Sequence, residues 1–301
     1  MKLVSYNVGL VNPEAAMLNV DGLVADLLAM EADVVALHEF EARMCPRLDE
    51  ALMRTYGYSH YLTLADDGYS CALFSRLPME NVVELQLDAD SEDARRLQQL
   101  EVTPEGATEA WKRGVIAATI YKADGSKVRV ITCHLMSNGF NQLLIYDGLS
   151  PFKRFPLFWR RYRMSCEGRD IESRYVRALA EKAFASGMEV IVCGDTNSFW
   201  WSRTIRGLVR GFSSGGFIGS SAMPSNENRL VMRDAFEGNC WGIGILKRWA
   251  SPLGYGHTLY THRVMYFRLD YVLYSTGLRL RSYRVPHLKH SDHYPLVVEF
   301  V

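Results

Sequence analysis

Short apolar runs separated by polar turns recur along the whole chain, and they predict a protein rich in β-strands. Each run has the length of a strand rather than of a helix, and many are rich in β-branched residues. The predicted strands lie at residues 3–8, 33–40, 71–75, 115–122, 128–135, 189–194, 268–275 and 295–300.

Helical spacing appears between some of these runs. Apolar residues recur at intervals of three and four from Val20 to Leu28 and again from Val176 to Phe184. The second pattern stops at Gly187, a residue type that commonly ends helices. With about ten strands and few helices, the chain is predicted to form an α/β domain over residues 1–301, with a mixed or partly antiparallel sheet.

Two segments interrupt this rhythm. Residues 88–113 are acidic and predict a surface excursion with a helical piece, and residues 138–170 predict a longer insertion. Within the second, residues 151–163 interleave basic and aromatic side chains. Such interleaving suits a phosphate backbone with stacked bases, or an anionic membrane surface. The alternative is an insertion that packs its rings on the domain and leaves its arginines in water.

Composition and charge exclude some classes of protein. With 48% hydrophobic residues and 10 Pro, the chain is not of a disordered or low-complexity type. Its formal net charge of zero argues against a strongly basic nucleic-acid binder, but the charge is uneven. Residues 1–110 hold 7 Lys/Arg and 20 Asp/Glu, whereas residues 111–301 hold 27 and 14. The split is typical of a chain that handles a polyanion with one part of its surface, or of two solvated faces of opposite sign.

The cysteines and the N-terminus bear on location. The 6 Cys form no CxxC pair or zinc-ligand spacing, and Cys133 and Cys193 lie within predicted strands as buried thiols, which favours a reducing compartment. No apolar stretch approaches the roughly 18–20 residues that span a bilayer. Met1 and Lys2 lead directly into a predicted strand without a signal peptide. We therefore expect a cytoplasmic location, unless a leader has been removed.

Polar residues stand at the ends of several predicted strands. Asn7, Glu39, His134, Asp195 and Asn197 end or follow their runs, whereas Asp270 and the Ser291-Asp292-His293 triplet begin theirs. In an antiparallel pair the start of one strand lies beside the end of its neighbour. These side chains are therefore predicted to meet at one rim of the sheet.

The same residues carry a family resemblance. Asn7 in SYNV, Glu39 in ALHEFE, His134 in TCHL, Asp195 and Asn197 in GDTNS, Asp270 in RLDYVLYS, and Asp292 with His293 in SDHYPL occur in that order. The chain resembles the endonuclease/exonuclease/phosphatase superfamily, a group of metal-dependent phosphoesterases. The resemblance implies a four-layered α/β/β/α sandwich of two packed mixed β-sheets, with the site at one rim. His38 stands where Gln is common in the family.

The residue types fit hydrolysis of a phosphodiester. Glu39 supplies a hard oxygen ligand, Asn7 an amide that binds the metal or one of its waters, and Asp292 a further contact. Such incomplete oxygen ligation suits Mg²⁺ or Mn²⁺.

The other rim residues are predicted to act on water and phosphate. Asp195 is the candidate general base, and Asn197 orients water and phosphate. Asp270 is expected to hold His293 as an imidazolium that donates to the phosphoryl oxygens, and His134 is a second donor. The resemblance supports these roles. We expect in-line attack by water, P–O cleavage and no covalent intermediate.

The substrate is less well specified. Arg174 is a candidate phosphate fork, and Trp200, beside Trp201, a candidate base-stacking residue. The alternatives are an arginine on a solvated face and a tryptophan packed at a helix start. The leading prediction is a phosphodiesterase whose partner is a phosphate-bearing substrate, with nucleic acid among the candidates. A phosphomonoesterase of inositol phosphates or phospholipid headgroups is the first rival. A non-catalytic protein that binds nucleic acid or membrane is the second.

Overall fold

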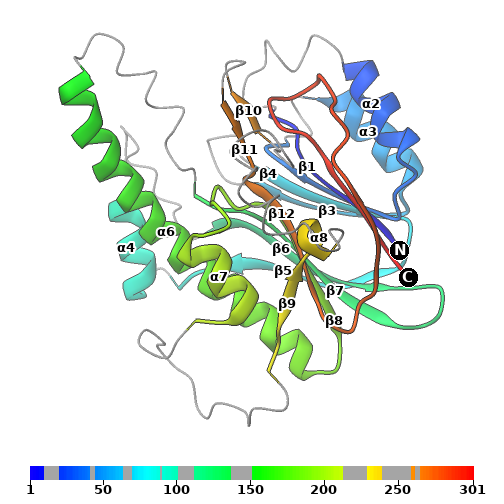
Figure 1. Ribbon diagram of the computed structural model, residues 1–301. Coiled ribbons are helices and arrows are strands. Elements are labelled where there is room, and N and C mark those ends of the chain that lie inside the picture. The colour runs from blue at the N-terminus through cyan, green and yellow to red at the C-terminus, as the bar shows by residue number, and fades with distance from the viewer. Residues whose placement is uncertain are drawn as a thin grey trace.

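The computed structural model describes residues 1–9, 20–40, 45–63, 70–88, 90–100, 112–136, 151–212, 229–238, 259–261 and 265–301. Two six-stranded sheets dominate it, and a two-stranded sheet of β10 (Leu259–Thr261) and β11 (Met265–Phe267) lies beside them (Figure 1).

The first sheet has the strand order β13-β14-β1-β2-β4-β3. Its strands are β1 (Lys2–Asn7), β2 (Val34–His38), β3 (Tyr58–Thr63), β4 (Ser70–Ser75), β13 (Leu280–Arg284) and β14 (Leu296–Phe300). β1 runs parallel to β2 and antiparallel to β14, so this sheet is mixed and joins the two ends of the chain.

The second sheet has the order β5-β6-β7-β8-β12-β9. Its strands are β5 (Met79–Gln86), β6 (Lys112–Tyr121), β7 (Lys127–His134), β8 (Glu189–Asp195), β9 (Met232–Asp234) and β12 (Asp270–Ser275). β7 and β8 are parallel, whereas β12 is antiparallel to β8. This sheet is therefore mixed as well.

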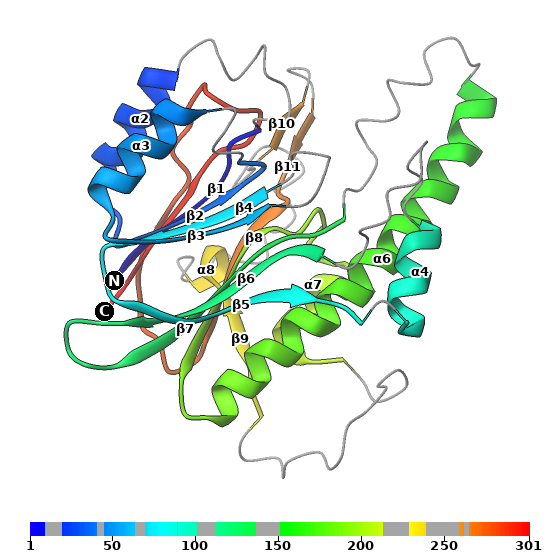
Figure 2. The ribbon, with the colours of Figure 1, turned by 180° about the vertical axis from the view of Figure 1, so that it is seen from behind.

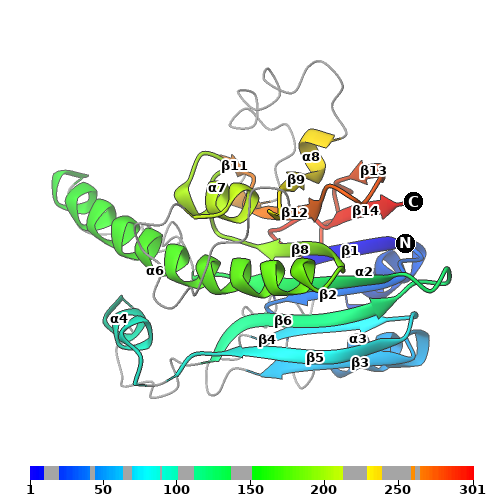
Figure 3. The same ribbon diagram turned by 90° about the horizontal axis from the view of Figure 1, so that it is seen from below.

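Helices cover the outer face of each sheet. The first sheet carries α2 (Val20–Ala29) and α3 (Pro46–Thr55), and the second carries α4 (Glu92–Leu100), α6 (Pro151–Ala185) and α7 (Arg203–Arg210) (Figure 2). The short α8 (Ala235–Gly238) follows β9. Figures 1 and 2 show the two sheets stacked between these helices, and Figure 3 shows α6 running over the strands of the second sheet. The predicted four-layered sandwich is confirmed.

Three apolar cores separate the layers, and strand alternation assigns residues to them. In β1, Leu3 packs between the sheets, whereas Val4 and Tyr6 pack against α2 and α3. In β8, Ile191 and Cys193 face the other sheet, whereas Val190 and Val192 face the outer helices. The period of two in side-chain direction thus fills both faces of each sheet.

All eight predicted strands form, and the unpredicted elements are peripheral. β3, β5, β9 and β13 are the edge strands of the two large sheets. The helix predicted near residues 176–184 is the last part of α6, which begins at Pro151. Residues 151–170 of the predicted insertion therefore form the first part of this helix. Residues 138–150 lie outside the described residues, as do most side chains of residues 151–161.

The acidic segment 88–113 contains the helical piece that was predicted, α4, which buries Ala94, Leu97 and Leu100. Residues 89 and 101–111 lie outside the description. Whether residues 1–301 act as one folding unit stays a prediction. Within the described parts of the chain, none of the helices has the length and apolar character needed to cross a bilayer.

Gly194 lets β8 approach β7 just before the site. Its φ is +140°, and a Cβ placed there lies 1.9 Å from the carbonyl oxygen of Cys133. Because Gly194 and Cys133 are paired residues of β8 and β7, their backbones cannot move apart without breaking hydrogen bonds between the two strands.

We expect Gly194→Ala to lower the free energy of unfolding by about 3 kcal/mol or more, because strained backbone and steric overlap add. Gly125→Ala is the matched control: its φ is also positive, +79°, but a Cβ there meets nothing within 4 Å. It should cost about 1 kcal/mol. Urea unfolding measures both, and equal losses would contradict the close approach of the two strands.

Candidate active site

Strand alternation places the polar rim residues between the two sheets. In β1 and β8 the positions that face the other sheet lead by steps of two to Asn7 and Asp195. The same steps lead to His134 at the end of β7 and to Asp270 at the start of β12. Each sheet therefore delivers its polar side chains to one end of the layer between them.

The strand register brings three of these residues side by side. Asp195 is the direct partner of Asp270 in the antiparallel pair and of His134 in the parallel pair. Asp195 and Asp270 are each only 1% exposed. Two carboxylates are thus buried at facing positions, where their charges must be compensated.

Asp195 is at the centre of the site. Its Oδ2 accepts a hydrogen bond from Asn7 Nδ2 at 3.1 Å, and its Oδ1 accepts one from the backbone N–H of Asn197 at 2.8 Å. The Nε2 atoms of His134 and His293 lie 3.8 and 3.7 Å from Oδ2. Asn197 holds its position with a φ of +48° and donates from Nδ2 to the carbonyl of Leu135.

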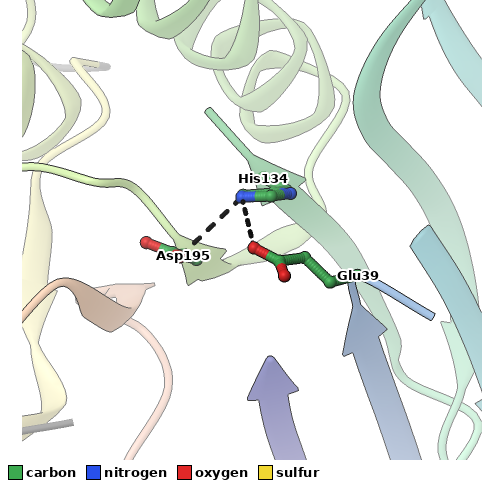
Figure 4. A group of neighbouring side chains, drawn as sticks. All are labelled: Glu39, His134 and Asp195. Carbon is green, nitrogen blue, oxygen red and sulfur yellow. Dashed lines mark ion pairs between the residues drawn. The ribbon is translucent and has the colours of Figure 1, made fainter. Parts of the chain in front are cut away.

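Glu39 reaches the same group from the other sheet. Simple alternation after His38 would turn it towards the outer helices, but its φ of +50° redirects the chain at the end of β2. Its Oε1 accepts from Asn7 Nδ2 at 3.1 Å and lies 3.5 Å from His134 Nε2. Figure 4 shows one ring nitrogen of His134 paired with the carboxylates of both Glu39 and Asp195.

A histidine–carboxylate pair adjoins this group. His293 Nδ1 lies 2.8 Å from Asp270 Oδ2, and both side chains are buried. Ser291 fixes the turn that carries His293: its Oγ donates to the carbonyl of Asn7 and accepts from the backbone N–H of His293. The end of β1 and the histidine are therefore tied together.

The buried charges shift the protonation of the site. Burial lowers the pKa of His293, but Asp270 and Asp195 overcome this and raise it to about 10. Burial and Asp270 raise the pKa of Asp195 to about 6, against the opposing effect of His293 and His134. Near neutral pH the site thus holds an imidazolium beside a carboxylate of raised basicity.

The carboxylates of Glu39 and Asp195, with His134 beside them, fit a hard divalent cation on the Glu39 side. The ligand atoms of Glu39, His134 and Asp195 all lie within 4.8 Å of one another. Two carboxylates that converge on one point repel each other, and a cation with several water ligands relieves that repulsion. A second group of that kind, Asp195, Asp270 and His293, already contains its own cation in the imidazolium.

Five predicted residues, Asn7, Glu39, His134, Asp195 and Asn197, are linked directly, and Asp270 with His293 joins them through Asp195. Asn7 presents its Nδ2 to the carboxylates, while its Oδ1 accepts from the backbone of Gly9. Asp292 is exposed beside that turn. Metal ligation by Asn7 and Asp292 stays a prediction.

Arg174 and Trp200 have structural partners. Arg174 lies within α6 rather than at its start, and its Nη2 is 3.2 Å from Asp93 Oδ1 on α4. Trp200 is partly buried against the core beneath α6 and α7. The predicted contacts of Arg174 and Trp200 with substrate stay predictions.

The sequence places Ser291 at the predicted rim without a role, and His38 has no predicted place in the site. The signal for Ser291 is its place two residues before His293, where a serine hydroxyl commonly caps a turn. The signal for His38 is its parity with Val34 and Ala36, which face the other sheet. His38 Nε2 lies 2.7 Å from Thr132 Oγ1, so it joins β2 to β7 beneath the site. Burial, with His134 nearby, lowers its pKa to about 3 and keeps it neutral.

Fold and site together define a class of hydrolases that act on phosphoesters. The sequence model of the Endonuclease/Exonuclease/phosphatase family matches residues 4–293, and the chain belongs to this family. The enzyme class and the family predicted from the sequence are confirmed. A search of curated proteins finds no match.

Solved structures share the fold at low identity. The chain superimposes on TDP2 from Caenorhabditis elegans with a TM-score of 0.60 and 15% identity, covering 100% of this chain and 74% of that one. The human Nocturnin catalytic domain with bound sulfate gives 0.58 and 16%, covering 100% and 94%. A 3′ phosphatase, NExo from Neisseria, bound to a product DNA hairpin, gives 0.57 and 17%, covering 100% and 99%.

The His293–Asp270 pair is testable by NMR in the absence of divalent cations. We expect His293 to remain an imidazolium until about pH 10, and Asp270→Asn to lower the pKa of His293 sharply, because the effect of burial then prevails.

The raised pKa of His293 also means that its pair with Asp270 stabilises the fold fully below about pH 6.5 and loses this effect as pH rises through about 10. Asp124→Asn, an exposed control, should leave His293 unchanged. Titration of wild-type His293 near 6.5 would contradict the pair.

Proposed function

We propose that the protein is a Mg²⁺- or Mn²⁺-dependent phosphodiesterase that hydrolyses nucleic acid or a related phosphodiester by in-line attack of water. The observation that carries this proposal is the junction at Asn7. The Nδ2 amide of Asn7 donates to both Glu39 and Asp195, and Nε2 of the His293 imidazolium lies 3.7 Å from the same oxygen of Asp195, Oδ2. A cation-binding side and a phosphate-binding side thus share one carboxylate.

Glu39 is the principal metal ligand in this proposal, because its carboxylate lies at the rim. Asn7 and Asp292 are the further candidate ligands. When bound, the cation neutralises phosphate charge and lowers the pKa of coordinated water. A phosphodiester is anionic and repels nucleophiles, so charge compensation and positioning account for most of its hydrolysis.

The residues of the chain supply the proton chemistry. Asp195 accepts a proton from the attacking water, and its pKa of about 6 makes it a better base than an ordinary aspartate. Asn197 fixes the carboxylate through its backbone N–H at 2.8 Å. His293 donates a charge-assisted hydrogen bond to a phosphoryl oxygen as negative charge grows, and a ring N–H of His134 is a further donor to phosphate. The result is P–O cleavage without a covalent intermediate.

The relatives support a nucleic-acid substrate without separating diester from monoester. The Neisseria neighbour is described as a 3′ phosphatase and holds a DNA product. This favours phosphomonoester hydrolysis as the second candidate. Release of inorganic phosphate identifies a monoesterase, whereas shorter oligonucleotides identify a diesterase.

We expect Asp195→Asn to lower kcat on a diester by about 10²–10⁴-fold, because the base is lost. His293→Ala should lower it by about 10²-fold or more. Chelation of divalent ions should abolish turnover, and Mg²⁺ or Mn²⁺ should restore it.

The control is Asp124→Asn, which removes an exposed carboxylate in the turn between β6 and β7. It should retain wild-type kcat, and circular dichroism should show all variants folded. Wild-type turnover by a folded Asp195→Asn protein would refute the assignment. So would full activity in excess chelator.

A further inference from the structure

One exposed face of the protein has no part in the chemistry described above. Four arginines lie exposed on α7 or against its end: Arg203, Arg206, Arg210 and Arg229. We call them the arginine strip. The segment just before α7 carries Trp201, whose side chain is 48% exposed.

The turn after β8 holds Trp201 rigidly. Its ring stacks on Phe199, with centroids 4.8 Å apart and planes at 9°, and Trp200 meets it at 88°. The backbone N–H of Ser202 donates to the carbonyl of Phe199, which closes the turn, and the Ser202 hydroxyl caps α7. A large exposed ring that two neighbours hold in place loses little conformational entropy when a ligand stacks on it.

The position of this ring relates it to the site. Trp201 follows Asp195 by six residues, so it lies within about 20 Å of the catalytic carboxylate. α7 then runs on from Ser202, and its exposed arginines at 203, 206 and 210 follow helical spacing along one face. At 1.5 Å per residue they span about 10 Å, comparable to a few nucleotides.

The charges of the strip are largely uncompensated. Arg203 pairs with Asp170 at 3.7 Å, but its side chain is 67% exposed, so the pair is weak. Arg229 donates to the backbone carbonyl of Arg210 rather than to a carboxylate. Among the described residues no carboxylate forms an ion pair with Arg206 or Arg210. Planar guanidinium groups bind phosphate oxygens in a bidentate manner.

We infer that Trp201 and the arginine strip form a binding track for single-stranded nucleic acid, with a base stacked on Trp201 and phosphates on the arginines. This rests on the proposed function and names its substrate class. A membrane surface fits less well, because insertion needs several adjacent apolar side chains. Of the exposed large apolar residues described, only Trp201 and Val231, which follows Arg229 by two residues, adjoin the strip. Met53, Tyr58, Val83 and Val301 lie on other parts of the chain, so the strip lacks a continuous apolar surface.

In this track the stacking residue is Trp201 rather than Trp200, the residue predicted from the sequence. Trp200 packs against the core and supports Trp201 from the side. Arg174, paired with Asp93, is not needed for the track.

The test compares two substrates: a single-stranded oligonucleotide and methyl p-nitrophenyl phosphate, a small diester without a base. Trp201→Ala should lower the ratio of kcat/KM for the oligonucleotide over the small diester by at least about 5-fold. Trp201→Phe should restore most of the loss. Tyr58→Ala removes a ring of β3 that is 40% exposed, and it should not change the ratio.

The arginines are tested by salt dependence. Arg206→Ala with Arg210→Ala should weaken oligonucleotide binding and reduce the slope of log affinity against log salt by about 1.4. Arg279→Ala with Arg284→Ala removes two exposed arginines from the turn before β13 and from β13 itself, on the other sheet, and should leave the slope unchanged.

An unchanged substrate ratio and salt slope in these variants would overturn the inference. So would loss of binding to phosphatidylserine vesicles with unaltered oligonucleotide kinetics, which would assign the face to membranes. Turnover of the small diester without binding or cleavage of the oligonucleotide would also overturn it. If the wild-type protein cleaves neither substrate, the proposed function fails, but the binding titration still decides whether the track exists.

Discussion

The site depends on two buried carboxylates that face each other across β8 and β12. Asp195 and Asp270 are register partners, and their like charges repel strongly away from water. His293 compensates the pair from the Asp270 side, while Asn7 and the backbone of Asn197 donate to Asp195. The arrangement requires β12 to run antiparallel to β8 and the turn at Ser291 to return to the end of β1.

The sandwich makes this arrangement possible because strand alternation supplies two kinds of side chain from one strand. Apolar positions fill the core between the sheets, and the last position of the same face carries the polar group. Glu39 lies outside this rule and reaches the site through a left-handed backbone. Glu39 and Asn7 therefore come from the acidic first part of the chain, whereas His134, Asp195, the His293–Asp270 pair and the arginine strip come from the basic remainder.

The pattern of residues predicts the interior of this protein better than its periphery. Central strands such as β1 and β8 are apolar on both faces, so their apolar runs alone identify them as strands. The edge strand β13 reads LRSYR and β9 is three residues long, and neither shows a signal that separates it from a loop. Among site residues, strand-end positions were predictable, whereas exposure was not: only folding shows that Trp200 packs inward while Trp201 faces solvent.

In the proposed site a metal ion lies on the Glu39 side of Asp195 and an imidazolium on the Asp270 side. Anomalous diffraction from crystals soaked with Mn²⁺ tests this division directly. We expect an anomalous peak within coordination distance of the Glu39 carboxylate, with His293 Nδ1 still hydrogen-bonded to Asp270. A peak between Asp270 and His293, or a Glu39 carboxylate without any ion at saturating Mn²⁺, would contradict it.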